Sequence, residues 1–144
     1  MSSTTSYIWA ILASITWGLA YALDEKILST YSPVHLAIVN AIVALLIFVP
    51  IAIFGNHGNF SELTQNKHFG LLLLSSVLIS IAGVFILYGI KNLGASTASI
   101  IEISYPAFVT LFTVLLWHER ITPQFFLGGF LMLCGSFIII RSQT

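Results

Sequence analysis

Glu102 is the first side chain whose type could do chemistry, and it lies in the stretch SIIEISYPAF, which spans Ser99 to Phe108. It is an ionisable residue among isoleucines. On insertion scales, a charged residue at the centre of a membrane helix costs about 2.5 to 3.5 kcal/mol, and such residues almost always face a bundle interior or a water-filled cavity. The pattern indicates a carboxylate that binds a substrate amine, a cation or a proton. The alternative is a structural pair with Lys91 or with a hydroxyl group.

Pro106 follows Glu102 by four residues. Because proline has no N–H, the carbonyl of Glu102 would lose its helical hydrogen bond. A helix kink at Pro106 would therefore place a free carbonyl and a carboxylate at one depth, where they could hold a cation, an amine or a proton. Helical spacing puts further polar side chains on the same stripe, which consists of Ser99, Glu102, Pro106, Thr110 and Thr113.

A second candidate group lies near the N-terminus, where Trp17, Tyr21 and Asp24 step by four and three residues along one helix face. An aromatic face that ends in a carboxylate suits the wall of a cavity for a cationic or amphipathic ligand. Trp and Tyr are also common anchors at the membrane interface, and Asp24 and Glu25 are expected close to that interface. Asn40 is the strongly polar residue of its segment, where it would hydrogen-bond a ligand or join two helices.

Other chemistries lack a pattern. No histidine stands at metal-ligand spacing from another ligand, and HER at 118–120 is not the zinc motif H-E-x-x-H because residue 122 is threonine. Cys134 lies in an apolar run, which is typical of a packing residue. Five Lys and Arg balance five Asp and Glu, so there is no basic patch for nucleic acid. We therefore predict no enzyme activity, no metal site and no cofactor.

The composition places these residues in a membrane. The chain of 144 residues is 58% hydrophobic and only 7% charged, whereas a soluble domain is about 25% charged. A helix needs about 20 mostly apolar residues to cross a bilayer. The candidate segments are apolar on all sides, without the alternation of a β-barrel strand, so the sequence predicts an all-α bundle of five transmembrane helices in a single domain over residues 1–144. The predicted helices are 7–27, 33–54, 69–90, 95–117 and 123–140.

The ends of these segments carry helix signals. Ser32 and Thr122 each precede a proline, which places a capping hydroxyl before the first helical position. Residues 20–22, AYA, look like a signal-peptide cleavage site. The residues before Tyr7 carry no Lys or Arg, however, so the first segment is expected to remain as a helix.

The basic residues set the expected orientation. With five helices, Lys67 and Arg120 fall on one side of the membrane, and Lys26, Lys91 and Arg141 fall on the other. Orientation follows the Lys and Arg bias between the two sides, and two against three is almost no bias. The sequence therefore leaves both dual insertion and one fixed orientation open.

Three features carry a resemblance to a known family. TWG in the first helix, a proline within the fourth, and the closing block LLWHERITPQFFLGGFLMLCGSFIII resemble the drug/metabolite transporter superfamily in its EamA-like branch. The resemblance implies a helical membrane carrier for small metabolites, often an exporter of amino acids or related compounds. Most members carry two inverted five-helix repeats, and this chain has the pattern of one, which implies a second copy. The resemblance also makes Glu119 and Arg120 residues of the turn between the last two helices.

Together these observations predict a carrier in a bacterial inner membrane that works as a homodimer, parallel or antiparallel, by alternating access. It is expected to bind a small amino-acid-like or cationic substrate near the middle of the bilayer. The alternatives are a non-transporting membrane subunit, in which Glu102 is an assembly contact, and one half of a hetero-oligomeric carrier. The predicted site residues are Glu102, Trp17, Tyr21, Asn40, Ser99 and Tyr105, with the helix kink at Pro106.

Overall fold

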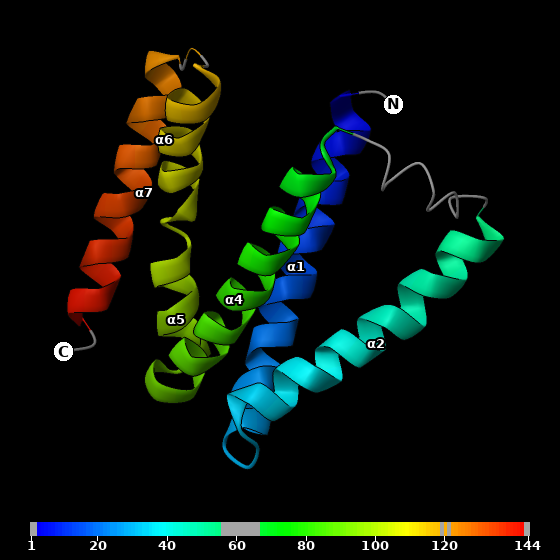
Figure 1. Ribbon diagram of the computed structural model, residues 1–144. Helices are drawn as coiled ribbons and strands as arrows, with labels where there is room; N and C mark the ends of the chain where they lie inside the picture. The colour runs from blue at the N-terminus through cyan, green and yellow to red at the C-terminus, as the bar shows by residue number, and fades with distance from the viewer. Residues whose placement is uncertain (1–2, 56–66, 119, 121, 143–144) are drawn as a thin grey trace.

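The described residues fold into helices joined by short turns (Figure 1). The computed structural model describes residues 3–55, 67–118, 120 and 122–142, and within them there is no strand. Five helical stretches are long and apolar enough to cross a membrane, with α5 and α6 together making up one of them. The predicted all-α fold with five membrane-spanning stretches is therefore confirmed. The helices are α1 (Ser3–Leu28), α2 (Pro33–Phe54), α4 (Phe69–Leu93), α5 (Ala95–Glu102), α6 (Tyr105–Trp117) and α7 (Pro123–Ser142).

Two turns show why the helices begin and end where they do. The hydroxyl of Ser32 accepts a hydrogen bond from the His35 N–H at 3.2 Å, and Pro33 opens α2, so an orphan backbone donor is satisfied at the cap. Between α4 and α5 stands the single residue Gly94, with φ of 82°. A glycine reaches this left-handed region without the steric cost of a Cβ, which allows two helices to follow each other so closely.

The fourth span is two helices rather than one. The sequence analysis expected a continuous helix over 95–117 with a kink at Pro106, whereas α5 ends at Glu102 and α6 begins at Tyr105. Across the interruption the N–H of Ser104 bonds to the Ile101 carbonyl at 3.2 Å, three residues back instead of four. The Ser104 hydroxyl donates to the same carbonyl at 2.7 Å. Pro106 is the second residue of α6, where a missing N–H is tolerated.

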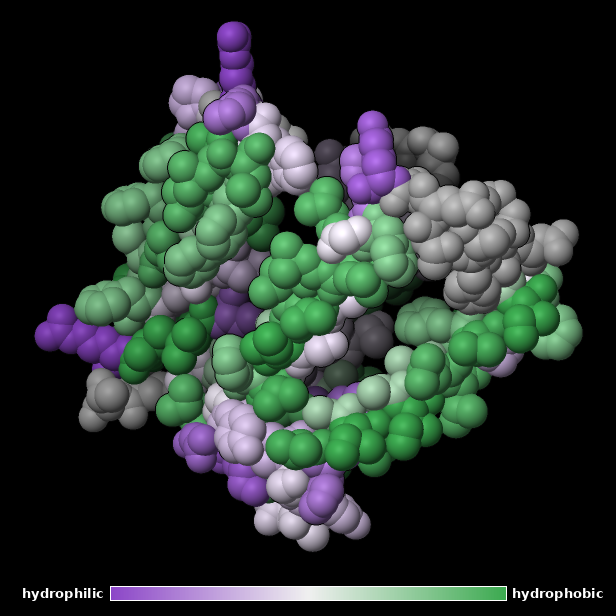
Figure 2. Space-filling view, viewed as in Figure 1, coloured by the Kyte–Doolittle hydropathy of each residue, from purple (hydrophilic) through white to green (hydrophobic). Residues whose placement is uncertain are grey.

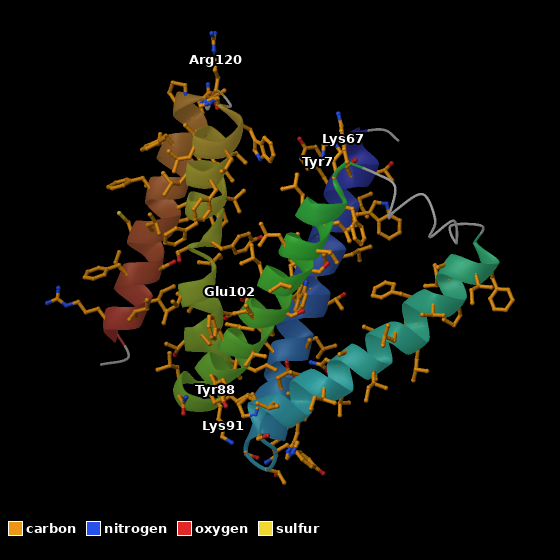
Figure 3. All side chains as sticks on the ribbon, viewed as in Figure 1. Tyr7, Lys67, Tyr88, Lys91, Glu102 and Arg120 are labelled. Carbon is orange, nitrogen blue, oxygen red and sulfur yellow. The ribbon has the colours of Figure 1, made fainter. Side chains whose placement is uncertain are left out.

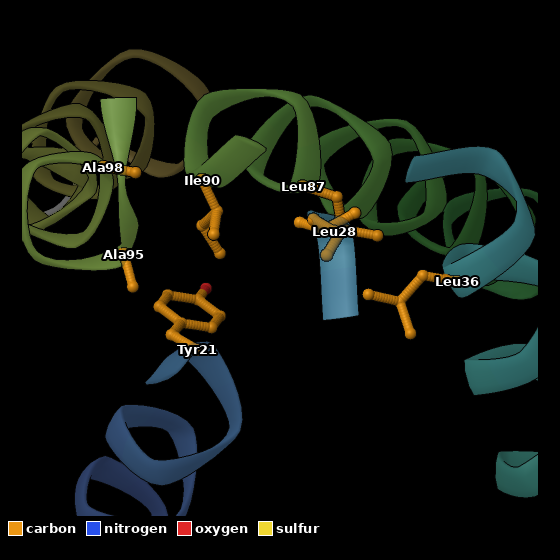
Figure 4. Close-up of a cluster of buried hydrophobic side chains, with 7 residues drawn as sticks. All are labelled: Tyr21, Leu28, Leu36, Leu87, Ile90, Ala95 and Ala98. Carbon is orange, nitrogen blue, oxygen red and sulfur yellow. The ribbon is translucent and has the colours of Figure 1, made fainter. Parts of the chain in front are cut away.

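The helices pack most closely at one end of the molecule. In Figure 1 they converge near the α1–α2 and α4–α5 turns, while α2 leans away from the others toward the opposite end. Helix α4 packs against α5, α1 and α2, and α5 also contacts α1 and α7. Seven buried residues gather in one cluster near the converging turns (Figure 4). They are Tyr21, Leu28, Leu36, Leu87, Ile90, Ala95 and Ala98.

Most of the remaining apolar surface is exposed. Figure 2 shows a broad hydrophobic face over the helices, with hydrophilic residues gathered mainly toward its two ends. The accessible surface is 11667 Å², whereas a compact soluble protein of this mass exposes roughly 7,300 Å². Lys67 and Arg120 lie at one end and Lys91 at the other (Figure 3). An apolar band between two polar ends is the surface that a bilayer covers.

Candidate functional site

Glu102 has a specific partner inside the bundle. Glu102 is the last residue of α5, and it is half-buried. The hydroxyl of Tyr21, on α1, donates to both carboxylate oxygens, at 3.0 Å to Oε1 and 2.8 Å to Oε2. Hydrogen bonds to an ionised carboxylate are stronger than those between neutral groups. One tyrosine therefore links two helices whose contacting residues stand 81 positions apart in the chain.

Trp17 extends this contact along α1. Its ring meets the ring of Tyr21 edge to face, with centroids 5.6 Å apart and an angle of 63° between the planes. Aromatic pairs prefer this arrangement because the positive edge of one ring meets the negative face of the other. Tyr21 is 9% exposed and Trp17 is 62% exposed. Trp17 therefore reaches the surface, while the tyrosine between it and Glu102 is enclosed.

The carboxylate keeps acceptor capacity for a ligand. An ionised carboxylate has about four lone-pair positions, and Tyr21 is the one hydrogen-bond donor to it within the described residues. Among the described residues, no Lys, Arg or His side chain forms an ion pair with Glu102. Lys91, one of its two expected structural partners, instead donates to the Tyr31 carbonyl at 3.2 Å. Of the two structural partners that the sequence suggested for Glu102, Lys91 or a hydroxyl, the structure shows a hydroxyl, that of Tyr21. The carboxylate can still accept a further donor, such as an ammonium group.

Two other predicted site residues flank Glu102 in the chain. Ser99, one turn earlier on α5, is half-buried and donates its hydroxyl to the Ser96 carbonyl at 2.9 Å. Tyr105 opens α6 just beyond the interruption, and it is 60% exposed. The polar stripe continues into α6, where the hydroxyls of Thr110 and Thr113 donate to carbonyls of their own helix. The serine and both threonines therefore use their donors within the backbone.

Asn40 lies apart from this group. It is exposed on α2, and α2 packs chiefly against α4 and, to a smaller extent, α1. The role of Asn40 in the binding site stays a prediction. For Asn40 to reach the site, α2 would have to move, or Asn40 would have to contact a ligand held by a neighbouring molecule. Glu119 lies outside the described residues, while Arg120 is exposed at the end of the molecule. No group of three His, Cys, Asp or Glu side chains that could hold a metal ion occurs among the described residues.

The sequence analysis did not assign a binding role to Glu25. In the structure this residue of α1 contacts the first residue of α5. Its Oε2 accepts a hydrogen bond from the N–H of Ala95 at 2.8 Å. A signal for this contact exists in the sequence. Gly94 stands directly before α5 and has no side chain to cap it, so an acceptor from another segment can satisfy the first N–H groups of the helix.

Comparison with known proteins agrees with this structure. The model of the EamA-like transporter family matches residues 4–141. A protein of Clostridium kluyveri named "Uncharacterized transporter" is 25% identical over 138 residues, which are 94% of this chain and 43% of that relative. The chain thus spans less than half the length of the relative. No solved structure matches it significantly. The resemblance noted from the sequence is confirmed, and the chain belongs to the EamA-like transporter family.

Proposed function

We propose that the protein is a secondary transporter of small amino-acid-like or cationic metabolites, with Glu102 at its central site. The observation that carries the proposal is the carboxylate held by Tyr21 within a membrane-spanning stretch. An ionisable group in that setting is typical of a substrate or proton pathway. The carboxylate would bind either the amine of the substrate or a coupling proton. Membership of a transporter family supports this function over a purely structural role.

The proposed working unit is a homodimer. The relative from Clostridium kluyveri is long enough to hold a second unit of this size, and a second copy would supply that unit here. Small residues repeat every four positions along α1, at Ala10, Ser14, Gly18 and Ala22. This face supports a dimer, because no other atom of the described chain lies within 4 Å of the position that a Cβ on Gly18 would take. The same holds for Gly128 on α7. Small residues let helices approach closely in membranes, and these two have no neighbour within the described chain.

The proposed cycle is alternating access around Glu102. The helices converge at one end and diverge toward the other (Figure 1), an arrangement compatible with a site reached from one side at a time. An arriving ammonium group or proton would compete with the Tyr21 hydroxyl for the carboxylate. The interruption between α5 and α6 lies directly beside that carboxylate, so movement there would change its surroundings. The protein would act in the inner membrane of a bacterium.

The test uses the carboxylate itself. Dicyclohexylcarbodiimide modifies carboxylic acids in apolar surroundings, and peptide mass spectrometry identifies the labelled residue. We expect the purified protein to be labelled at Glu102 and to be protected by its substrate when the twenty amino acids and small primary and quaternary amines are screened. A protecting compound is then measured in counterflow uptake into liposomes.

Two variants make the experiment specific. Glu102→Gln keeps the shape and a hydrogen-bonding group, and we expect it to lose binding of the protecting compound by more than tenfold, or about 1.4 kcal/mol. Asn92→Ala is the control, because Asn92 is exposed and its amide donates to the Tyr88 carbonyl of its own helix, so binding should stay within twofold of the native protein. Normal uptake by Glu102→Gln would refute the central role of the residue. A monomeric chain without uptake would instead favour the non-transporting subunit, and uptake only with a different partner chain would favour the hetero-oligomeric carrier.

A further inference from the structure

Helix α5 depends on another helix for its start. The first N–H groups of a helix have no partner within it, and the residue before α5 is Gly94, which offers no side chain. The carboxylate of Glu25 on α1 takes the place of a cap and accepts the Ala95 N–H at 2.8 Å. Gly94 also faces this carboxylate, because a Cβ there would be in van der Waals contact with its Oε1 at 3.5 Å.

The same face of α1 holds both ends of α5. Tyr21 and Glu25 are four residues apart, which places them one turn apart on that face. Glu25 contacts the first residue of α5, and Tyr21 contacts the last, which is Glu102. Ala95, at the first contact, and Ala98, one turn further along α5, belong to the buried cluster. Because α5 has only eight residues, about 12 Å of helix, a shift at its first residue moves its last residue as well.

We infer that Glu25 is a positioning residue for the Glu102 site. Glu25 lies on α1 and caps the first residue of α5, so it fixes the position of α5 along the axis of α1. That position in turn sets the contact between the Tyr21 hydroxyl and the Glu102 carboxylate. Glu25 itself does not touch the ligand. The inference rests on the proposed function only for what the site binds, since the effect of Glu25 on Glu102 is measured without any substrate.

The experiment separates the effect of side-chain length at position 25 from the effect of its charge. Glu25→Gln loses the charge, but its amide oxygen still reaches the Ala95 N–H. Glu25→Asp keeps the charge and is one methylene too short to reach in the same geometry, and Glu25→Ala loses both. The readout is the rate of dicyclohexylcarbodiimide labelling of Glu102 at one fixed pH. The Tyr21 hydroxyl contacts both oxygens of the Glu102 carboxylate, so loss of that contact leaves the oxygens open to the reagent and speeds labelling.

We expect Tyr21→Phe to raise the labelling rate at least fivefold. Glu25→Asp and Glu25→Ala should raise it at least threefold, whereas Glu25→Gln should stay within twofold of the native rate. If Glu25 acts through the tyrosine, the double variant Glu25→Asp with Tyr21→Phe is labelled no more than twofold faster than Tyr21→Phe alone. Lys91→Met is the control, because Lys91 makes a separate contact at the same end of the bundle and its loss should leave the rate within twofold.

Several outcomes would overturn the inference. They are native labelling in Glu25→Asp, a glutamine variant that behaves like the alanine variant, fold-changes that multiply in the double variant, or an equal effect of Lys91→Met. If Glu25→Ala does not fold, the aspartate and glutamine variants carry the same comparison. Failure of the proposed function is recognised separately: no compound would then protect Glu102, while the effect of position 25 on its labelling would remain.

Discussion

At the scale of single residues, the Tyr21–Glu102 contact explains how a carboxylate is tolerated in an apolar stretch. Inserting a charged group there costs a few kcal/mol. The single O–H of Tyr21, shared between the two carboxylate oxygens at 2.8 and 3.0 Å, offsets part of that cost. This contact leaves lone pairs of the carboxylate open, so the carboxylate is held in place and can still accept a ligand. A group that is held but not saturated suits an exchange site better than a permanent structural pair.

The Tyr21 hydroxyl should therefore stabilise the fold. We expect Tyr21→Phe to lower the free energy of unfolding by about 1 to 3 kcal/mol, because the half-buried carboxylate loses its donor. The measurement is unfolding in mixed detergent micelles followed by circular dichroism. Tyr105→Phe is the matched control, since Tyr105 is 60% exposed and should change stability by less than 0.5 kcal/mol. Equal stability of both phenylalanine variants would contradict a stabilising role for the contact.

The site shows which parts of it a sequence can predict. Glu102 is conspicuous because an ionisable residue in an apolar segment is costly. Its contact with Tyr21 could not be derived, since the two residues meet only through the packing of α1 on α5. Position 25 was missed for a related reason. Helical spacing placed Asp24 with Trp17 and Tyr21, but spacing alone does not decide whether the third or the fourth following residue faces the neighbouring helix.

At the scale of elements, the interruption between α5 and α6 is the main departure from the predicted helices. The proline rule indicated that the Glu102 carbonyl would lose a donor. It did not indicate that the chain would leave the helix at Ile103 and Ser104. There the Ser104 side chain donates to the Ile101 carbonyl, which satisfies a carbonyl at the end of α5. The second helix was simpler to predict, because its cap and proline act locally.

Removing the proline tests whether this interruption serves function. Pro106→Ala restores an N–H, and we expect it to join α5 to α6 through a bond to the Glu102 carbonyl. Amide hydrogen exchange at 103–107 should slow at least tenfold, while uptake of the protecting compound falls and folding is retained. Pro50→Ala is the control, because Pro50 also lies inside a helix, in this case α2. This variant should take up the compound at the rate of the native protein. Unchanged uptake in the Pro106 variant would mean that the interruption is only structural.

At the scale of the whole molecule, the described helices leave far more apolar surface exposed than a compact chain of this size. Lipid accounts for the outward faces. It does not account for the splayed arrangement, in which the buried cluster occupies one end only. A second copy that inserts between the diverging helices would enclose the site. The positions of Lys67 and Arg120 at one end and Lys91 at the other (Figure 3) leave both a parallel and an antiparallel pair open.

The dimer itself is the last prediction. Gly128 on α7 has open space where a Cβ would stand, so Gly128→Leu meets no obstacle within the described chain and should fold. If α7 packs closely on a second copy, the leucine blocks that approach, and native mass spectrometry should show dimers in the native protein and monomers in the variant, with uptake lost. Gly70→Leu, at an equally open position on α4, should remain dimeric. A native protein that is monomeric yet transports would exclude the shared site.

The arrangement of the two copies follows from labelling. With Cys134 replaced by serine, Gly55→Cys places one thiol at the exposed residue that follows α2 and leaves every basic residue unchanged. Membrane-impermeant maleimide should reach it from both sides of the membrane in an antiparallel dimer and from one side in a parallel dimer. Because the basic residues divide two against three, we expect labelling from both sides. Two lysines added beside Arg141, on the side that already carries three basic residues, make the division five against two and should then force one orientation. If the antiparallel pair is the working unit, that variant inserts normally and loses uptake, whereas retained uptake would establish the parallel pair.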